Sequence, residues 1–427
     1  MITSDQRIDR EQAIAWYQKN RARTAEIFGL LTDSAYYDQP IALRHPIVFY
    51  EGHVPAFSLN TLVKKALGKA GIDERLERLF ARGIDPEEAG PSSSSPLTWP
   101  DRGEVRAFVE AADTMVLDAL AHDTLDVPDH PLLDRADAVY TILEHEAMHQ
   151  ETLLYMWHRL PHEKKRPPTS YRAVTNGAQV TPEDIVIPGG PVRLGARPGS
   201  IPFGWDNEFG EVTVDVAPFS VGRFNVTNAD FLEFVGAGGY SRPELWSSAD
   251  WAWVQEQELR HPSFWAHDGK WRWRGMFEDL PLPLQWPVYV SHAEASAYAR
   301  WRHRRLLTEA EYQRLVTPFP VGGHYDFAGW EPTPIGSHSE SQSPDGVEDL
   351  VGNGWEWTST VFRPFPGFQA SASYPEYSSD FFDESHYVIK GASPVTAREL
   401  VRPTFRNWFR PRYPYVYATF RLAGTAS

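Results

Sequence analysis

The chain has 427 residues, of which 42% are hydrophobic and 23% are charged, and its formal net charge is −16. This composition is typical of a packed globular protein with two or three domains, and excludes a disordered or fibrous chain. The negative charge argues against binding of nucleic acid or an anionic membrane. The absence of cysteine excludes disulfides, thiolate nucleophiles and iron–sulfur clusters, so any metal must be held by His, Asp or Glu.

Residues 1–160 carry apolar side chains at the three-and-four spacing of amphipathic helices. The segments with this spacing are 14–31, 48–67, 105–120 and 139–156. Four such helices predict an antiparallel bundle, with turn-rich connections at 85–100 and 123–131. The charged first 33 residues contain no apolar signal core, and no stretch approaches the length of about 20 apolar residues that spans a membrane. We therefore expect a soluble, cytoplasmic protein.

The composition changes after a polar, Pro- and Lys-rich segment at 161–182, which we interpret as a linker. Residues 183–427 alternate short β-like runs with Gly, Pro and Asn clusters and predict a loop-rich α+β domain. The predicted strands include 212–216, 288–290 and 387–389, and the predicted helices are 228–235, 292–302 and 309–315.

The clearest chemical signal is the run His145-Glu146-Ala147-Met148-His149 in the fourth predicted helix. Side chains four residues apart lie on the same helix face, so both imidazoles can bind one ion. Two ordinary histidines at this spacing are the alternative. The run also has the HExxH spelling of zinc peptidases, with Glu146 after the first histidine.

A third candidate ligand is His53, in a predicted second helix that begins at Arg44. His53 shares an apolar stripe with Phe49 and Phe57 and is expected to face the bundle interior, either as a core histidine or as a ligand. Three neutral histidines leave three positions of an octahedral Fe(II) open. They are equally compatible with catalytic zinc, so ligand chemistry alone does not choose the metal.

Ordered motifs along nearly the whole chain resemble the non-haem iron sulfoxide synthases of ergothioneine and ovothiol biosynthesis. In the first half they are residues 43–53, which begin with LRHP and end with GH, and residues 144–151, which begin with EH and end with HQE. In the second half they are FGWDNE at 203–208, VTN at 226–228, RLLTEAE at 305–311, GNGWEWT at 352–358, KGAS at 390–393 and FRLA at 420–423. The resemblance implies a DinB-like four-helix bundle over 1–160. It also implies a C-type-lectin-like, formylglycine-generating-enzyme-like domain over 183–427.

The resemblance further implies that His53, His145 and His149 bind Fe(II), and that the enzyme is an O₂-dependent oxidoreductase. Its substrates would be hercynine and cysteine or a related thiol, joined by a C–S bond and oxidised to a sulfoxide. Small molecules are the expected partners, with no nucleic acid and no membrane. The HExxH peptidase interpretation becomes remote beside these matches.

The resemblance also assigns roles in the second half. Tyr374 matches a catalytic tyrosine that would donate a proton to the reduced oxygen species, and Tyr377 would contact the imidazole substrate. Trp408 matches a residue that lines the betaine pocket, where an aromatic face suits a trimethylammonium group. Two packing tyrosines in a Tyr-rich loop are the alternative.

Two positions depart from the family pattern. Met148 replaces a Gln of some relatives, so an imidazole-orienting hydrogen bond must come from elsewhere, with Gln150 a distant candidate. Phe409 stands where relatives that use γ-glutamylcysteine carry Asp, which favours a different sulfur donor. Arg406 and Arg410 are expected to clamp a substrate carboxylate, with simple ion pairs as the alternative.

Several alternatives stay open at this point. Histidine could replace hercynine, as in ovothiol-type 5-histidylcysteine sulfoxide synthases, or selenium could replace sulfur in the donor. A non-catalytic ligand-binding protein is the alternative of another class. Formylglycine generation requires cysteines and is excluded, and methyl transfer is not expected because no glycine-rich nucleotide loop is present. The run 206–208 is expected to be a solvated turn rather than a calcium site.

Overall fold

The computed structural model describes residues 9–81, 99–178 and 180–426. The chain divides into two compact units. The first unit comprises 1–168, 199–203 and 371–375, and the second comprises 169–198, 204–370 and 376–427. The first unit thus recruits two short segments that sequence order had assigned to the second domain. Most of the predicted connection 85–100 lies outside the described residues.

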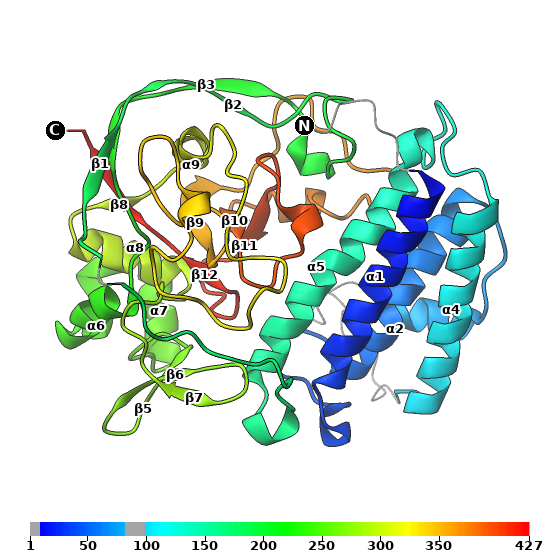
Figure 1. Ribbon diagram of the computed structural model, residues 1–427, viewed down its shortest axis with the longest axis horizontal. Coiled ribbons are helices and arrows are strands. Elements are labelled where there is room, and N and C mark those ends of the chain that lie inside the picture. The colour runs from blue at the N-terminus through cyan, green and yellow to red at the C-terminus, as the bar shows by residue number, and fades with distance from the viewer. Residues whose placement is uncertain (1–8, 82–98, 179, 427) are drawn as a thin grey trace. The chain divides into compact units, whose positions relative to one another are not determined.

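The first unit is built on four long helices, as the apolar spacing predicted. They are α1 (Arg10–Gly29), α2 (Ile47–Ser58), α4 (Arg102–His122) and α5 (Asp137–Arg159). Helix α2 packs against α4 and α5, and α1 packs against the same two helices, which gives a four-helix bundle (Figure 1). Side-chain caps begin two of them, because Asp9 accepts from the Gln12 N–H and Asp101 from the Glu104 N–H.

Helix α2 begins later than the sequence predicted. It starts at Ile47 after an extended Pro46, not at Arg44, because a proline disfavours helical backbone in the residue before it. An eight-residue π-helix (Leu59–Ala66) continues α2, and a short helix α3 (Glu74–Phe80) follows. Gly52 is needed where α2 meets α3, since an added Cβ would lie 2.4 Å from the Phe80 ring.

The second unit contains four small sheets. The two four-stranded sheets have the orders β1-β4-β13-β8 and β11-β10-β9-β12, and β2-β3 and β5-β6-β7 complete the set. The strands of the four-stranded sheets are β1 (Asp184–Ile187), β4 (Phe219–Gly222), β8 (Arg305–Leu306), β9 (Gly354–Val361), β10 (Tyr387–Ala392), β11 (Asn407–Phe409), β12 (Ala418–Thr419) and β13 (Leu422–Thr425). Those of the smaller sheets are β2 (Gly190–Leu194), β3 (Val212–Val216), β5 (Trp265–His267), β6 (Trp271–Arg274) and β7 (Asp279–Pro281). Of the strand pairs in the described residues, β12 and β9 alone are parallel, and long irregular segments connect the strands (Figure 1).

Four helices accompany these sheets: α6 (Asn228–Gly236), α7 (Ser248–Glu256), α8 (His292–Trp301) and α9 (Glu309–Leu315). The predicted helices correspond to α6, α8 and α9, whereas α7 was missed. The predicted strand 288–290 is wrong. Its amides bond singly, Val288 to the Val226 carbonyl and Val290 to the Ala418 carbonyl, so its extended backbone joins no continuous ladder.

The acidic run Asp206–Glu208 is a short 3₁₀ helix and is buried, which corrects the expected solvated turn. Glu208 accepts hydrogen bonds from Arg402 Nε at 2.9 Å and Thr404 Oγ1 at 2.6 Å. The Arg402 charge and these bonds outweigh desolvation and lower the pKa of Glu208. Among the described helices, none combines the length and apolar character needed to cross a bilayer.

Candidate metal centre

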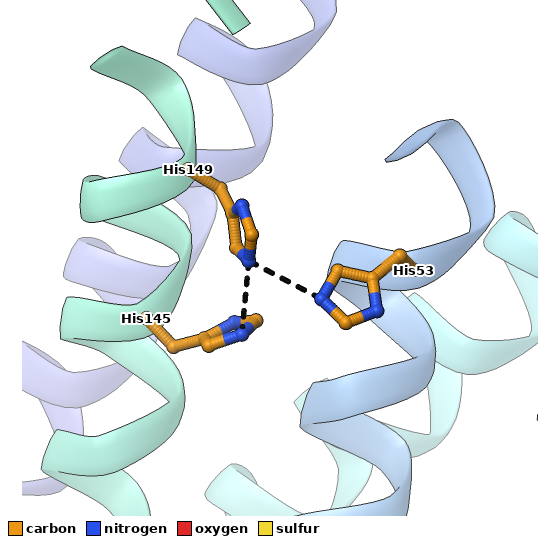
Figure 2. A group of neighbouring side chains, drawn as sticks. All are labelled: His53, His145 and His149. Atoms are coloured by element: carbon orange, nitrogen blue, oxygen red, sulfur yellow. Dashed lines mark hydrogen bonds between the residues drawn. The ribbon is translucent and has the colours of Figure 1, made fainter. Parts of the chain in front are cut away.

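Three histidines converge inside the first unit. His53 lies on α2 (Figure 2). His145 and His149 lie one turn apart on α5, and their rings are directed towards His53. The Nε2 atom of His149 is 3.2 Å from His53 Nε2 and 3.1 Å from His145 Nε2. One ligand atom from each residue lies within 4.8 Å of the others, and all three residues are buried. Of the described residues, no other three His, Asp or Glu side chains meet in this way.

These spacings fit a shared ion. Imidazole nitrogens bind a divalent metal at about 2.0–2.1 Å, so two ligands at right angles are about 3 Å apart. The two shorter Nε2–Nε2 separations, 3.1 and 3.2 Å, are close to that value. The donor set is neutral nitrogen, which suits iron and zinc and is unsuited to magnesium or calcium. The three side chains therefore fit a transition-metal centre.

Burial keeps the three imidazoles neutral at physiological pH. Desolvation lowers the pKa of His53 to about 4, and it lowers the pKa of His145 and of His149 well below the ordinary value. The neighbouring imidazoles lower the latter two further. A neutral imidazole offers a lone pair, so the site is prepared for a cation without first releasing protons.

Among the described residues, one of the three rings is oriented by a hydrogen bond through its outer nitrogen, Nδ1. His53 Nδ1 lies 2.6 Å from the Phe80 carbonyl oxygen, which fixes the proton on Nδ1 and leaves Nε2 free to bind a metal. The Nδ1 atoms of His145 and His149 are buried and have no hydrogen-bond partner within the described part of the chain. Because the acceptor at Phe80 is a backbone carbonyl, no side-chain pattern could have revealed it.

Glu146 does not join the site, which argues structurally against the peptidase interpretation. Its Oε1 accepts hydrogen bonds from Arg21 Nη1 at 2.8 Å and Thr24 Oγ1 at 2.7 Å, both on α1. Gln150 also turns to α1 and donates to the Asn20 carbonyl at 3.0 Å, so it does not orient the metal-binding rings. Both follow a ligand by one position on α5 and face α1 rather than α2.

Tyr374 lies in the short segment 371–375, which belongs to the first unit, whereas residues 204–370 and 376–427 belong to the second. Its half-buried ring lies 6.0 Å from the His145 ring and 5.2 Å from the Phe57 ring, edge-on in both cases. The preceding Ser373 donates a hydrogen bond to Asp137 at the start of α5. This bond ties the 371–375 segment to the helix that carries two of the histidines.

Tyr377 and Trp408 lie together in the second unit. The Tyr377 ring stacks on Trp205 at 4.0 Å and meets Trp408 edge-on at 5.2 Å. Trp408 also stacks on Phe362 at 4.2 Å and is half-buried. The sequence assigned these two residues separate substrate contacts, and the structure brings them together with Trp205 and Phe362 in one aromatic cluster.

The three remaining candidates differ in their surroundings. Phe409 is half-buried and stacks on Tyr413 at 5.4 Å, and Arg410 is exposed. Arg406 is only 2% exposed and is bonded through Nε and Nη2 to Glu309 at 2.8 and 3.1 Å. Its Nη1 donates to the backbone carbonyls of residues 207 and 363. Arg406 thus forms a buried ion pair that uses most of its donors, which favours the ion-pair alternative over the substrate clamp.

Two family models match this chain, one for each unit. The DinB superfamily model matches residues 17–153, and the sulfatase-modifying factor enzyme 1-like domain model matches residues 170–315 and 319–426. The chain thus combines a DinB-type helical bundle, which carries the three histidines, with a domain of the sulfatase-modifying factor type.

Similar proteins with assigned names show to which family the chain belongs. The chain is 34% identical to the hercynine oxygenase of Mycolicibacterium thermoresistibile over 396 residues, covering 83% of this chain and 85% of that protein. It is 33% identical to that of Mycolicibacterium smegmatis over 346 residues, covering 75% and 77%. Ergothioneine biosynthesis protein 1 of Schizosaccharomyces pombe is 29% identical over 441 residues, 92% of this chain and 53% of that longer protein. This chain belongs to the hercynine oxygenase family of enzymes.

Proposed function

We propose that this protein acts in ergothioneine biosynthesis as an Fe(II)- and O₂-dependent sulfoxide synthase. The substrates would be hercynine and cysteine or a related thiol. The observation that carries the proposal is the convergence of three buried, neutral imidazoles in a member of this family. Family membership supports the substrate class, and the nitrogen ligands support a transition metal.

The proposed reaction balances without an external reductant. The thiol loses its S–H hydrogen and the imidazole loses a C–H hydrogen, and a C–S bond forms between them. One oxygen atom of O₂ ends on sulfur, and the other leaves as water with those two hydrogens. The four electrons that reduce O₂ come from C–S coupling and from oxidation of sulfur. Iron held by His53, His145 and His149 would supply the O₂ chemistry that the side chains alone lack.

The chain's own residues would supply orientation and a proton. Tyr374, whose ring lies edge-on to the His145 ring, would donate its phenolic proton near the metal ligands. Trp408 would bind the trimethylammonium group of hercynine, which carries charge but no N–H to donate, and Tyr377, edge-on to Trp408, would contact the imidazole. Phe409, stacked on Tyr413, offers no charge to an ammonium group of the thiol donor and supports cysteine over γ-glutamylcysteine.

Metal analysis is the first test of the proposal. The protein, loaded with Fe(II) without oxygen and then desalted, should retain about one iron per chain, as expected for a single three-histidine site. The His53→Ala and His149→Ala variants should lose it, with affinity lowered at least about a hundredfold. His158→Ala is a matched control, because it removes another buried imidazole from α5 outside the cluster. Iron retained by the His53 variant would contradict the site.

Product analysis tests the reaction. The iron-loaded protein, given O₂ and cysteine with either hercynine or histidine, should yield a coupled sulfoxide by mass spectrometry, and hercynine should be preferred. γ-Glutamylcysteine and a selenium donor form parallel arms. Tyr374→Phe should lower the rate of sulfoxide formation by about 10²–10⁴-fold, the usual contribution of a positioned acid. Absence of product with every donor, in protein that holds iron, would favour the ligand-binding alternative.

A further inference from the structure

One metal-binding ring is held in place by an unusual contact. A hydrogen bond from the ring nitrogen that does not bind the metal normally fixes the orientation of a metal-binding imidazole. His53 has such a bond, from its Nδ1 atom to the Phe80 carbonyl. His145 has none, because its buried Nδ1 has no hydrogen-bond partner among the described residues. Some other contact must therefore set the plane of the His145 ring.

Phe57 supplies that contact. Its ring stacks face to face on the His145 imidazole, with centroids 3.5 Å apart and an interplanar angle of 8°. Phe57 lies on α2 four residues after His53, so the same helix face presents a metal ligand and the ring that covers another ligand. The edge of Tyr374 is 5.2 Å from the same phenyl ring.

The geometry of the stack depends on charge. A centroid separation of 3.5 Å equals the contact distance of two carbon atoms, about 3.5 Å, so the rings have almost no lateral offset. Two electron-rich rings disfavour such a sandwich, because their negative faces oppose each other. An imidazole that donates its lone pair to a cation becomes electron-poor, and the phenyl face then attracts it as it attracts other cations. The stack should therefore be stronger when metal is bound.

We propose that Phe57 is a positioning residue of the metal centre, which orients the His145 imidazole in place of a hydrogen bond and stabilises its metal-bound form. This inference rests on the proposed function, because it requires that the three histidines hold iron. It assigns Phe57 a role through His145 and no contact with the reacting atoms.

The test compares metal binding by four forms of the full-length protein. Phe57→Leu removes the flat face but keeps apolar volume, and Phe57→Tyr keeps the ring. Phe49→Leu is the matched control, because Phe49 stacks on His53 at 4.8 Å, while His53 remains fixed by its bond to the Phe80 carbonyl. Anaerobic titration gives the dissociation constant of Fe(II), and the visible spectrum of bound Co(II) reports ligand geometry. Circular dichroism confirms that each form is folded.

We expect Phe57→Leu to weaken Fe(II) binding by about tenfold and to alter the Co(II) spectrum. A tenfold loss is at the lower end of what is found when a residue that contacts a metal ligand is replaced. Phe57→Tyr should keep the wild-type Fe(II) affinity and Co(II) spectrum. Phe49→Leu should change the Fe(II) dissociation constant by less than about threefold and leave the Co(II) spectrum unchanged. Wild-type affinity and spectrum in Phe57→Leu, no rescue by Phe57→Tyr, or equal losses in the two leucine variants would overturn this inference alone. A wild-type protein that takes up no Fe(II) would overturn the proposed function as well.

Discussion

Buried histidines occur in both units of this protein, and they serve different purposes. The metal-centre imidazoles have two close neighbours of their own kind, whereas His292 in the second unit stacks on Tyr387 at 3.8 Å. The Nε2 atom of His292 has no hydrogen-bond partner among the described residues. Burial lowers the pKa of His292 to about 3; a hydrogen bond to the Thr358 backbone opposes this shift and Arg300 adds to it. A neutral ring that packs as an aromatic side chain explains these contacts.

This lowered pKa predicts loss of stability in acid. The pKa of His292 is about 6.5 in the unfolded chain and about 3 in the folded chain. Between these two pH values the unfolded chain binds a proton at His292 that the folded chain does not bind, so the free energy of unfolding falls as the pH falls. His292→Phe should flatten the pH dependence of the unfolding free energy by up to about 1 kcal/mol per pH unit in that window. Urea unfolding between pH 7 and pH 4 measures this slope.

The control for His292 is His122→Gln, at an exposed position on α4. A flattening seen in His292→Phe and absent from this control would be specific to the buried ring. A His292→Phe slope equal to the wild-type slope would show that this ring is not protected from protonation.

At the scale of elements, α1 and α5 are joined by polar contacts behind the metal centre. Arg21 on α1 bonds Glu146 on α5 at 2.8 Å and Asp113 on α4 at 3.1 Å, and Tyr17 donates to the same Asp113 at 2.7 Å. Glu146 is 1% exposed. These contacts fix the rotation of α5 about its axis, which determines the direction in which the residues next to Glu146 point. The α5 face that carries His145 therefore turns towards α2.

Removing one partner of this buried pair should be costly. Glu146→Ala leaves the Arg21 guanidinium with Asp113 as its remaining carboxylate partner and should lower the free energy of unfolding by up to about 3–5 kcal/mol, because the buried charge loses its more buried partner. Chemical denaturation followed by circular dichroism measures the change. Glu74→Ala removes an exposed partner of Arg78 and should cost at most about 0.5 kcal/mol. Equal effects of the two substitutions would contradict a structural role for Glu146.

At the scale of the whole molecule, the metal ligands and the aromatic cluster belong to different units. His53, His145, His149 and Tyr374 all lie in the first unit, and Tyr377 and Trp408 lie in the second. The first unit therefore contains all three histidines of the proposed metal site. The second unit is organised around buried ion pairs, of which Arg421 with Glu356 and Arg406 with Glu309 are examples.

Metal binding should consequently stabilise the first unit selectively. At Fe(II) concentrations about a hundredfold above the dissociation constant, linkage predicts a stabilisation of about 2.7 kcal/mol for the state that binds metal. Hydrogen exchange with mass spectrometry should show slower exchange in peptides from α2 and α5 after anaerobic addition of Fe(II). Peptides from β9 and β10 are the internal control and should change little. Equal protection in both units would contradict a metal site confined to the bundle.

The sequence itself determined the features that depend on local geometry. The apolar spacing predicted the four long helices of the bundle, and the spacing of His145 and His149 placed both on one face of α5, because a helix turn relates residues four apart wherever the helix occurs. The predicted strand at 212–216 and helix at 309–315 coincide with β3 and α9. The run 288–290 has strand-like composition but no continuous ladder, since pairing depends on a partner strand that its own residues do not specify.

Tertiary structure alone decided which distant groups meet. His53 and His149 are 96 positions apart, and their nitrogens come within 3.2 Å only because α2 packs on α5. Arg406 and Glu309, 97 positions apart, likewise form a buried ion pair only because the fold brings them together. Helical periodicity is a property of neighbouring residues, whereas metal coordination and charge pairing depend on packing between elements, and packing is set by the whole fold.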